Sequence, residues 1–274
     1  MSALIVDKEK CNSCGICVET CPTAIIEIAS GDSFPRWVND APERCIACGH
    51  CVAVCPLAAI AIDTMKPEDC APLMKDALPT PEQAELFLRS RRSIRVYKDE
   101  LVPRDKIEKL IDIARYAASG QNGQPLHWLV IQDPKEVNRL AGMVVDWMRG
   151  AIEAKPQMAK AFRFDTIVTA WEGGEDRVMY GAPHAIVCHA PTNSPMAQLD
   201  APIGLTYLEL AAHALGLGAC WAGWFQLGAM MHPPMQEALR LPEGHRSYGA
   251  MMIGHPKFKY ARIPLKRTPP VIWR

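Results

Sequence analysis

The sequence lacks the features that would draw a protein to nucleic acid, a membrane or a secretion pathway. Its 30 lysines and arginines balance 30 aspartates and glutamates, so there is no basic surplus to attract nucleic acid or anionic lipid. The first residues have no basic region followed by a long apolar core, which a secretory signal requires. The most apolar later stretch, residues 203–225, contains Glu209 and His213, which favours a buried helix and turn over a membrane span. We therefore expect a cytoplasmic protein with neither nucleic acid nor membrane as a partner.

Motifs for nucleotide binding and for hydrolysis are also missing. No expected strand is followed by a G-x-G-x-x-G run, so a dinucleotide-binding fold has no support. No Ser-His-Asp set and no obligatory acid or base stands out, and the catalytic residues are therefore unknown at this stage. His184 and His189 are expected to be structural.

The composition is that of a folded chain with two parts. Apolar residues make up 49% of the 274 positions and charged residues 22%, which is the ordinary globular range. The stretch 65–80 holds three prolines and no helical or strand period, which is typical of a linker. The sequence therefore predicts a small domain over residues 1–66, a linker over 67–80 and a larger domain over 81–274.

Eight of the eleven cysteines lie in two copies of one pattern, C-x2-C-x2-C-x3-C-P, over residues 11–22 and 45–56. Zinc sites are the alternative, but they have no use for a crowded third cysteine. Residues 4–64 closely resemble bacterial ferredoxins with two [4Fe-4S] clusters, in which the fourth cysteine of each run ligates the other cluster. The resemblance implies one cluster on Cys11, Cys14, Cys17 and Cys55, and another on Cys45, Cys48, Cys51 and Cys21. The remaining cysteines, Cys70, Cys188 and Cys220, are expected to be small buried hydrophobes.

The larger domain mixes helices and strands without regular alternation. Thr80, Pro81 and Gln83 predict a capping box and a helix to about Ser90. Apolar spacing and composition predict the other elements, which are helices over 103–118 and 201–215 and strands over 127–132, 185–190 and 248–254. This pattern predicts an α+β fold in which helices wrap a central sheet.

Three separated segments of the larger domain resemble the nitroreductase family, whose members bind FMN at a homodimer interface. They are RRSIR at 91–95, ASGQNGQP at 118–125 and GLGACWAGWF at 216–225. A fourth stretch, residues 253–267, resembles the family's last strand and the basic segment that follows it. The resemblance implies FMN-binding roles for Arg91, Arg92, Ser93, Arg95, Ser119, Asn122, Gly223, Trp224, Lys266 and Arg267.

Each of these segments also has an ordinary explanation when taken alone. RRSIR and the C-terminal basic run could be solvated surface charge, the Gly/Asn segment a plain loop, and residues 216–225 a core turn. Gly223 stands where many family members have an acidic residue, and Ala118 replaces a frequent proline. The order and spacing of the segments together favour a flavin site.

Large side chains concentrate in residues 143–180, at Trp147, Met148, Phe162, Phe164, Trp171 and Tyr180. The family resemblance implies a helical flap over the flavin here, and therefore an aromatic-lined substrate pocket. Ordinary core packing explains these residues equally well.

The combined interpretation is an oxidoreductase that takes electrons from an external low-potential donor. Two [4Fe-4S] clusters pass them to FMN and then to a small-molecule acceptor such as a nitroaromatic, a quinone or an activated alkene. Two alternatives stay open, which are a specialised flavin reaction such as reductive dehalogenation and an electron-transfer or redox-sensing component without its own substrate. Which acceptor and donor are used, and whether NAD(P)H reduces the protein directly, are left open.

Overall fold

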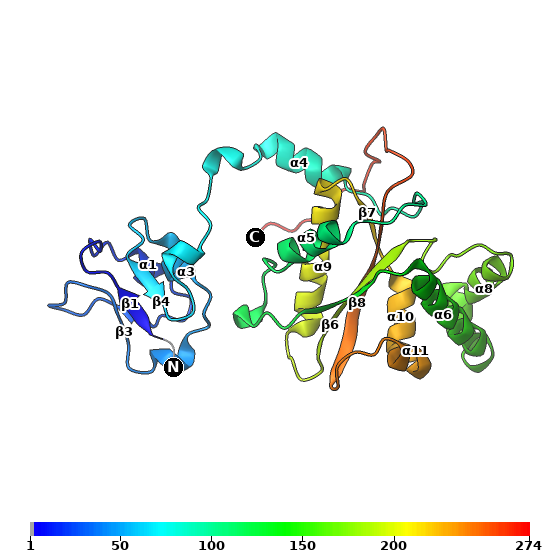
Figure 1. The fold of residues 1–274 in the computed structure, drawn as a ribbon, viewed down its shortest axis with the longest axis horizontal. Helices are drawn as coiled ribbons and strands as arrows, with labels where there is room; N and C mark the ends of the chain where they lie inside the picture. The colour runs from blue at the N-terminus through cyan, green and yellow to red at the C-terminus, as the bar shows by residue number, and fades with distance from the viewer. Residues whose placement is uncertain (1–2) are drawn as a thin grey trace. The chain divides into compact units, whose positions relative to one another are not determined.

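The computed structural model describes residues 3–274 as two compact units (Figure 1). The smaller unit comprises the residues up to Leu78 together with Gln121–Gly123, and the larger comprises Pro79–Gly120 and Gln124–Arg274. The chain therefore passes from one unit to the other inside the stretch expected to be a linker. None of the helices within residues 3–274 has the length and apolarity needed to cross a membrane.

The smaller unit consists of short elements around one apolar centre. Its two antiparallel pairs are β1 (Leu4–Val6) with β4 (Ile60–Ile62) and β2 (Ile26–Glu27) with β3 (Arg36–Trp37). Its helices are α1 (Ile16–Thr20), α2 (Ala41–Arg44) and α3 (His50–Val54), followed by the 3₁₀ turns η1 (Pro67–Asp69) and η2 (Lys75–Ala77). Its buried residues form a cluster of their own, Cys17, Ile25, Ile26, Ala41, Val52, Ile60 and Ile62.

The two cysteine runs have the same backbone path. Gly15 precedes α1 at φ 75° and Gly49 precedes α3 at φ 71°, a left-handed conformation that side chains disfavour. Ser13 (φ 58°) and Ala47 (φ 49°) are also left-handed at equivalent places. The sequence repeat is therefore a structural repeat.

The larger unit is built on a four-stranded antiparallel sheet in the order β5-β6-β8-β7. The strands are β5 (His127–Ile131), β6 (His184–Pro191), β7 (Gly218–Trp221) and β8 (His245–Gly254). β6 and β8 are buried on both faces, because successive side chains enter two different apolar clusters. Ala185 and Val187 enter one cluster, while Ile186 and Cys188 enter the other.

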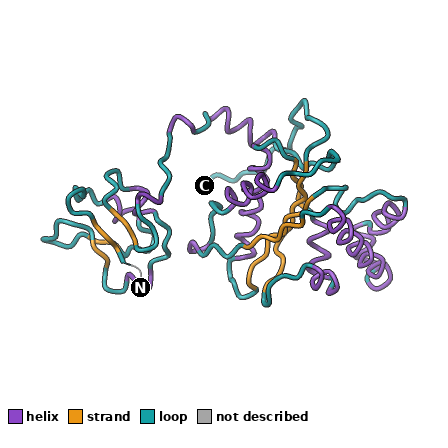
Figure 2. The backbone as a smooth tube through the Cα atoms, in the orientation of Figure 1, coloured by secondary structure: helices purple, strands orange, loops and turns teal. Residues whose placement is uncertain are grey.

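Helices cover both faces of this sheet (Figure 2). One face packs against α5 (Arg104–Ala114) and α9 (Ala197–Ala214). The other packs against α6 (Pro134–Ala154), α8 (Phe164–Glu172), α10 (Gly223–Met231) and α11 (Pro233–Ala238), with α7 (Pro156–Phe162) beside α6 and α8. The expected α+β architecture of a helix-wrapped sheet is confirmed.

The expected element positions hold, with shifts at the ends. α4 (Pro81–Ser90) begins with the expected capping box, in which Gln83 N–H donates to Thr80 Oγ1 at 3.3 Å. The helix expected over 103–118 ends at Ala114, since the buried helical spacing of α5 stops there. α9 begins at Ala197 rather than 201 and continues through Pro202, because residues of its first turns are buried in the unit.

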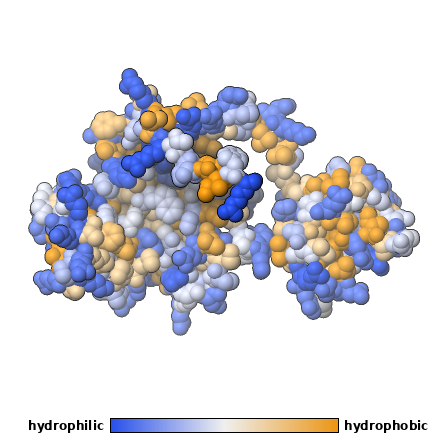
Figure 3. All heavy atoms as spheres, turned by 180° about the vertical axis from the view of Figure 1, so that it is seen from behind, coloured by the Kyte–Doolittle hydropathy of each residue, from blue (hydrophilic) through white to orange (hydrophobic). Residues whose placement is uncertain are grey.

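Three cysteines and two histidines outside the repeats were expected to be buried or structural. Cys188 and Cys220 are buried as expected, but Cys70 is only half-buried and its thiol lies 3.5 Å from the Lys66 carbonyl. His184 is fully buried, where Nε2 accepts from the Val102 N–H at 2.8 Å. Figure 3 shows that hydrophobic groups also remain on the surface, where Leu73 is 74% exposed.

Candidate functional site

In the smaller unit, the fold gathers the eight cysteines of the repeats into two sets of four. One cavity is lined by Cys11, Cys14, Cys17 and Cys55. A second cavity is lined by Cys21, Cys45, Cys48 and Cys51. Each set therefore combines three cysteines of one run with the last cysteine of the other, which is the crossed arrangement expected of two cubane clusters.

The environment of these thiols suits binding to a positively charged group. Burial raises the pKa of Cys51 to about 11, so this thiol resists ionisation unless a metal supplies the opposing charge. Burial also raises the pKa of Cys21, but hydrogen bonds from the Ile25 backbone and Thr23 outweigh it and lower the pKa overall. The Ala59 N–H donates to Cys55 Sγ at 3.3 Å, the kind of bond that stabilises a cluster-bound thiolate.

The cysteines surround cavities and do not converge on one point. Within residues 3–274, no three histidine, cysteine or acidic side chains are placed to hold a single metal ion. A tetrahedral zinc site needs such convergence, whereas a four-iron cluster keeps its four ligands on separate corners. The donor set therefore fits clusters better than zinc.

In the larger unit, residues 91–98 run beside the β7 edge of the sheet. The Ile94 N–H donates to the Ala219 carbonyl at 2.9 Å, and the Tyr97 hydroxyl donates to the Ile94 carbonyl at 2.6 Å. A side chain at Gly218 would place a Cβ 2.8 Å from Ile94, so the close approach requires glycine there. This packing holds the predicted basic segment against β7, the edge strand of the sheet.

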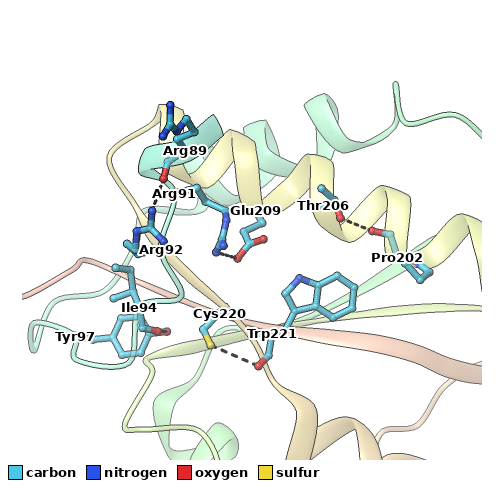
Figure 4. Close-up of polar contacts among 10 residues, drawn as sticks. All are labelled: Arg89, Arg91, Arg92, Ile94, Tyr97, Pro202, Thr206, Glu209, Cys220 and Trp221. Carbon is cyan, nitrogen blue, oxygen red and sulfur yellow. Dashed lines mark hydrogen bonds and ion pairs between the residues drawn. The ribbon is translucent and has the colours of Figure 1, made fainter. Parts of the chain in front are cut away.

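Arg91 forms an ion pair with a buried carboxylate of α9. Its Nη1 lies 2.8 Å from Glu209 Oε1, and the two side chains point toward one another in Figure 4. The Glu209 side chain is only 8% exposed, and burial raises its pKa despite the neighbouring Arg91 and a hydrogen bond with Trp221. Arg91 therefore has a structural partner as well as the predicted phosphate role.

A cavity of about 300 Å³ borders this ion pair. Its polar lining comes from Ser90, Arg91, Arg92, Glu209, His213, Lys259 and Tyr260. Three of these residues are cations, which suits an anionic group such as a phosphate. Ser93 contributes to a different contact, a hydrogen bond to the Cys220 thiol.

A second cleft, of about 420 Å³, opens at the start of α10. It is lined by Arg95, Phe162, Val178, Tyr180, Trp221, Gly223, Trp224, Leu227 and Met252. α10 begins without a side-chain cap, so the N–H groups of Gly223 and Trp224 in its first turn are free of intrahelical partners and can bind a ligand. The cleft thus combines aromatic walls, a guanidinium and backbone donors.

The turn after α5 is held from two sides. The Gly120 N–H donates to Asp200 Oδ1 at 3.0 Å, and the Gln124 N–H donates to Ser119 Oγ at 3.0 Å. Asn122 lies in the 3₁₀ turn η3 (Gly120–Asn122) with φ 53°. Ser119 therefore belongs to a turn that is held within the larger unit, whereas Asn122 is part of the smaller unit.

The predicted C-terminal pair lies apart from both cavities. Lys266 and Arg267 are exposed in the irregular segment that follows β8, and neither lines the cavities described above. Lys259, earlier in the same segment, does line the cavity beside Arg91. The roles of Lys266 and Arg267 in binding FMN stay predictions.

The aromatic stretch divides between the core and the cleft. Phe164 and Met148 are fully buried, while Phe162 and Tyr180 line the cleft. The sequence analysis did not single out Glu209, Asp200 or Asp176 as site residues. For Glu209 and Asp200 a signal existed, since they are the two acidic residues of an otherwise largely apolar helix.

Two family models match separate parts of the chain. Residues 88–255 match the family model described as Nitroreductase family, and residues 10–59 match that described as 4Fe-4S dicluster domain. A protein of Bacillus subtilis (strain 168) named FMN reductase (NAD(P)H) is 28% identical over 65% of this chain and 67% of its own length. The 4-nitrobenzoate reductase of Nocardioides sp. (strain LMS-CY) is 26% identical over 66% of this chain and 83% of its own.

Solved structures show the same fold for the larger unit. A nitroreductase with bound FMN from Bacteroides fragilis matches 71% of this chain and 100% of its own, with 20% identity and a TM-score of 0.57. A nitroreductase with bound FMN from Desulfitobacterium hafniense matches 69% and 96%, with 22% identity and a TM-score of 0.56. The likeness places the helix-wrapped sheet in a known fold class.

Proposed function

We propose that this chain, which belongs to the nitroreductase family and carries a 4Fe-4S dicluster domain, passes electrons from two [4Fe-4S] clusters through FMN to a small organic acceptor. It is an oxidoreductase with both kinds of cofactor. The observation that carries the proposed electron path is the presence in one chain of two crossed cysteine sets and of an aromatic cleft with a cation and free backbone donors.

In the smaller unit, the eight cysteines of the two runs would hold the clusters, and apolar residues surround them. Cys11, Cys14, Cys17 and Cys55 would bind one cluster, and Cys21, Cys45, Cys48 and Cys51 the other. Among the surrounding apolar residues, Ile25 and Ile60 are almost completely buried, and each lines one of the two cavities. A cluster carries one electron at a time, so an external low-potential one-electron donor is the fitting source.

In the larger unit, the residues around the two cavities would bind and orient FMN. FMN, when bound, accepts two electrons and can release them singly. Arg91 and Arg92 offer guanidinium donors for its phosphate, and Arg95 offers a cation at the aromatic cleft. The N–H groups of Gly223 and Trp224 favour added electron density next to them, because the N-terminal end of α10 carries partial positive charge.

The acceptor we propose is a small planar molecule, such as a nitroaromatic or a quinone. Phe162 and Trp224 stand edge to face at 5.9 Å between ring centroids and offer flat apolar walls on one side of the cleft. The family relative named 4-nitrobenzoate reductase supports a nitroaromatic. No proton donor is assigned, and water reaching the open cleft can supply protons.

We also propose that the protein works as a homodimer. Leu199, Ile203 and Tyr207 are exposed at successive turns of α9, by 62%, 39% and 40%. A helix that presents an apolar strip to water as well as to its own core is typical of an interface. The molar mass in solution, measured by light scattering, tests this, and a monomer that is saturated with FMN would contradict it.

The central experiment measures cofactors and then acceptor reduction by the whole protein. Anaerobically purified protein should contain about eight iron and eight sulfide per chain, from two four-iron clusters, and one FMN. The protein reduced by a one-electron donor is then mixed with nitroaromatics, quinones and activated alkenes. Zinc without sulfide would refute the cluster assignment, and full cofactor loading without oxidation by any acceptor would favour an electron-transfer component.

A further inference from the structure

Tyr180 has a backbone conformation that large side chains rarely adopt. Its φ is 54°, and Gly181 after it has φ 64°. A bulky residue in the left-handed region is strained, so such residues persist only where the surroundings hold them in place. Tyr180 lies in the turn that leads into the central strand β6, which begins at His184, and it lines the aromatic cleft.

One carboxylate holds this turn together. Asp176 Oδ1 accepts from the N–H groups of Val178 and Met179, each at 2.8 Å, and Oδ2 accepts from the Gly181 N–H at 3.0 Å. Val178 and Met179 are themselves buried in the core. Three charge-assisted hydrogen bonds and this burial offset the strain and fix the direction of Tyr180.

The ring of Tyr180 lies against the guanidinium of Arg95. The Arg95 Cζ is 5.7 Å from the ring centroid, within the range of a cation–π contact. Arg95 differs here from Arg91, whose guanidinium is paired with Glu209 at 2.8 Å. No carboxylate pairs with Arg95 within the described residues, so its charge stays available to a ligand in the cleft.

We propose that Asp176 and Tyr180 are positioning residues, which hold the Arg95 guanidinium over the aromatic cleft so that it meets the electron-rich edge of FMN. This inference rests on the proposed function, because it requires FMN in the cleft. A long arginine side chain on the surface loses much side-chain entropy when it binds. The Tyr180 ring restricts the Arg95 side chain before FMN binds. This should raise the affinity for FMN and the midpoint potential of bound FMN.

The test compares FMN affinity and the midpoint potential of bound FMN in full-length variants. Tyr180→Leu removes the ring face and should weaken FMN binding about two- to fivefold, the range for an exposed cation–π contact. It should also lower the potential, because a loosened cation stabilises the reduced cofactor less. Tyr180→Phe keeps the ring and should restore both values, and Asp176→Ala should act in the same direction as Tyr180→Leu.

Two controls separate positioning from general loss of structure. Tyr116→Leu removes a ring that packs on Arg115 at 5.1 Å, a contact of the same kind away from the cleft, and should change neither quantity. In an Arg95→Gln background, Tyr180→Leu should have no further effect, because the cation that it holds is gone. An undiminished effect in that background, or equal affinities and potentials of Tyr180→Leu and Tyr180→Phe, would overturn the inference alone. Failure of the wild-type protein to bind FMN would instead overturn the proposed function, and the inference with it.

Discussion

Arg91 has two roles in our interpretation, because it pairs with the buried Glu209 and is also proposed to bind the FMN phosphate. Substitutions of Arg91 and Glu209 can distinguish the structural role from the binding role. Arg91→Met removes the charge but keeps a long side chain, and it leaves the Glu209 carboxylate buried without its partner. Breaking a fully buried pair costs about 3–5 kcal/mol. Because the Arg91 side chain is 29% exposed, water screens part of this cost, and we expect a loss of about 1–3 kcal/mol.

The pH dependence of this loss follows from the pKa of Glu209. Burial raises that pKa above its ordinary value, and removing Arg91 takes away a group that opposes the rise. A group with a raised folded-state pKa destabilises the protein as pH rises through that pKa, since the folded state must then ionise it. The deficit of Arg91→Met relative to wild type should therefore be larger at about pH 8 than at about pH 5.

The decisive variant is the double substitution Arg91→Met with Glu209→Gln. Glutamine has no charge to leave unpaired and can still accept the hydrogen bond that Glu209 shares with Trp221. The double variant should regain most of the stability, a recovery of about 4–8 °C in Tm for about 2 kcal/mol in a domain of this size. Thermal unfolding followed by tryptophan fluorescence at both pH values measures this.

FMN and riboflavin then report on the phosphate role. Arg91→Met should weaken FMN binding at least tenfold, as loss of a charged hydrogen bond of about 1.5–3 kcal/mol implies, and should leave riboflavin binding nearly unchanged. The double variant should remain as weak toward FMN as the single variant. Recovery of FMN affinity together with stability would show that Arg91 acts only through Glu209, and an unchanged Tm in Arg91→Met would refute the buried-pair argument itself.

Three further outcomes follow from the structure. Cys14→Ser and Cys55→Ser should disturb the same cluster, because both cysteines line one cavity. The iron content and the spectrum of the remaining cluster check this. A Cys55→Ser spectrum unlike that of Cys14→Ser would contradict it. Burial and the neighbouring His245 and His127 lower the pKa of His189 to about 4. Because the unfolded chain takes up this proton more readily, wild-type protein should lose about 1–3 kcal/mol of stability as the pH falls from about 6.5 to about 4. His189→Gln should not show this loss in unfolding curves measured over the same pH range. Removing residues 1–66 should leave a protein that binds FMN, since the larger unit has its own core. The truncation should abolish the rapid reduction of the flavin by reduced ferredoxin in stopped-flow measurements. Equal rates of flavin reduction in the full chain and the truncated chain would exclude the clusters as the entry path.

The grouping of the cysteines could largely be predicted from the sequence, because three of the four cysteines that line each cavity lie in one run. Each run places three cysteines and a left-handed glycine within a few residues, so spacing alone dictates most of the geometry. The capping box of α4 is local in the same way, and it lies where Thr80 and Gln83 predict it. The helix-wrapped sheet could also be predicted, since most of β6 and the second half of β8 are apolar.

The proposed flavin site was less accessible to sequence reasoning, because the contacts around it join distant residues. Arg91 could be read as a phosphate ligand, but Glu209, 118 positions away, could not be assigned to it from spacing. Asp176 is one acid among many in the sequence, and only the folded turn shows its carboxylate accepting three backbone N–H groups. Lys259, which the sequence analysis did not single out, is the basic residue of the C-terminal segment that lines the Arg91 cavity.

The sequence by itself determined which chemistry this protein can carry, because cluster ligation depends on cysteine spacing and the basic and glycine-rich segments are recognisable one by one. Tertiary structure decided which charges are free to act. Packing pairs Arg91 with Glu209 while a tyrosine ring holds Arg95 at the cleft, and burial sets the ionisation of Glu209. These outcomes depend on the distance and dielectric between groups far apart in the chain, which local patterns do not contain.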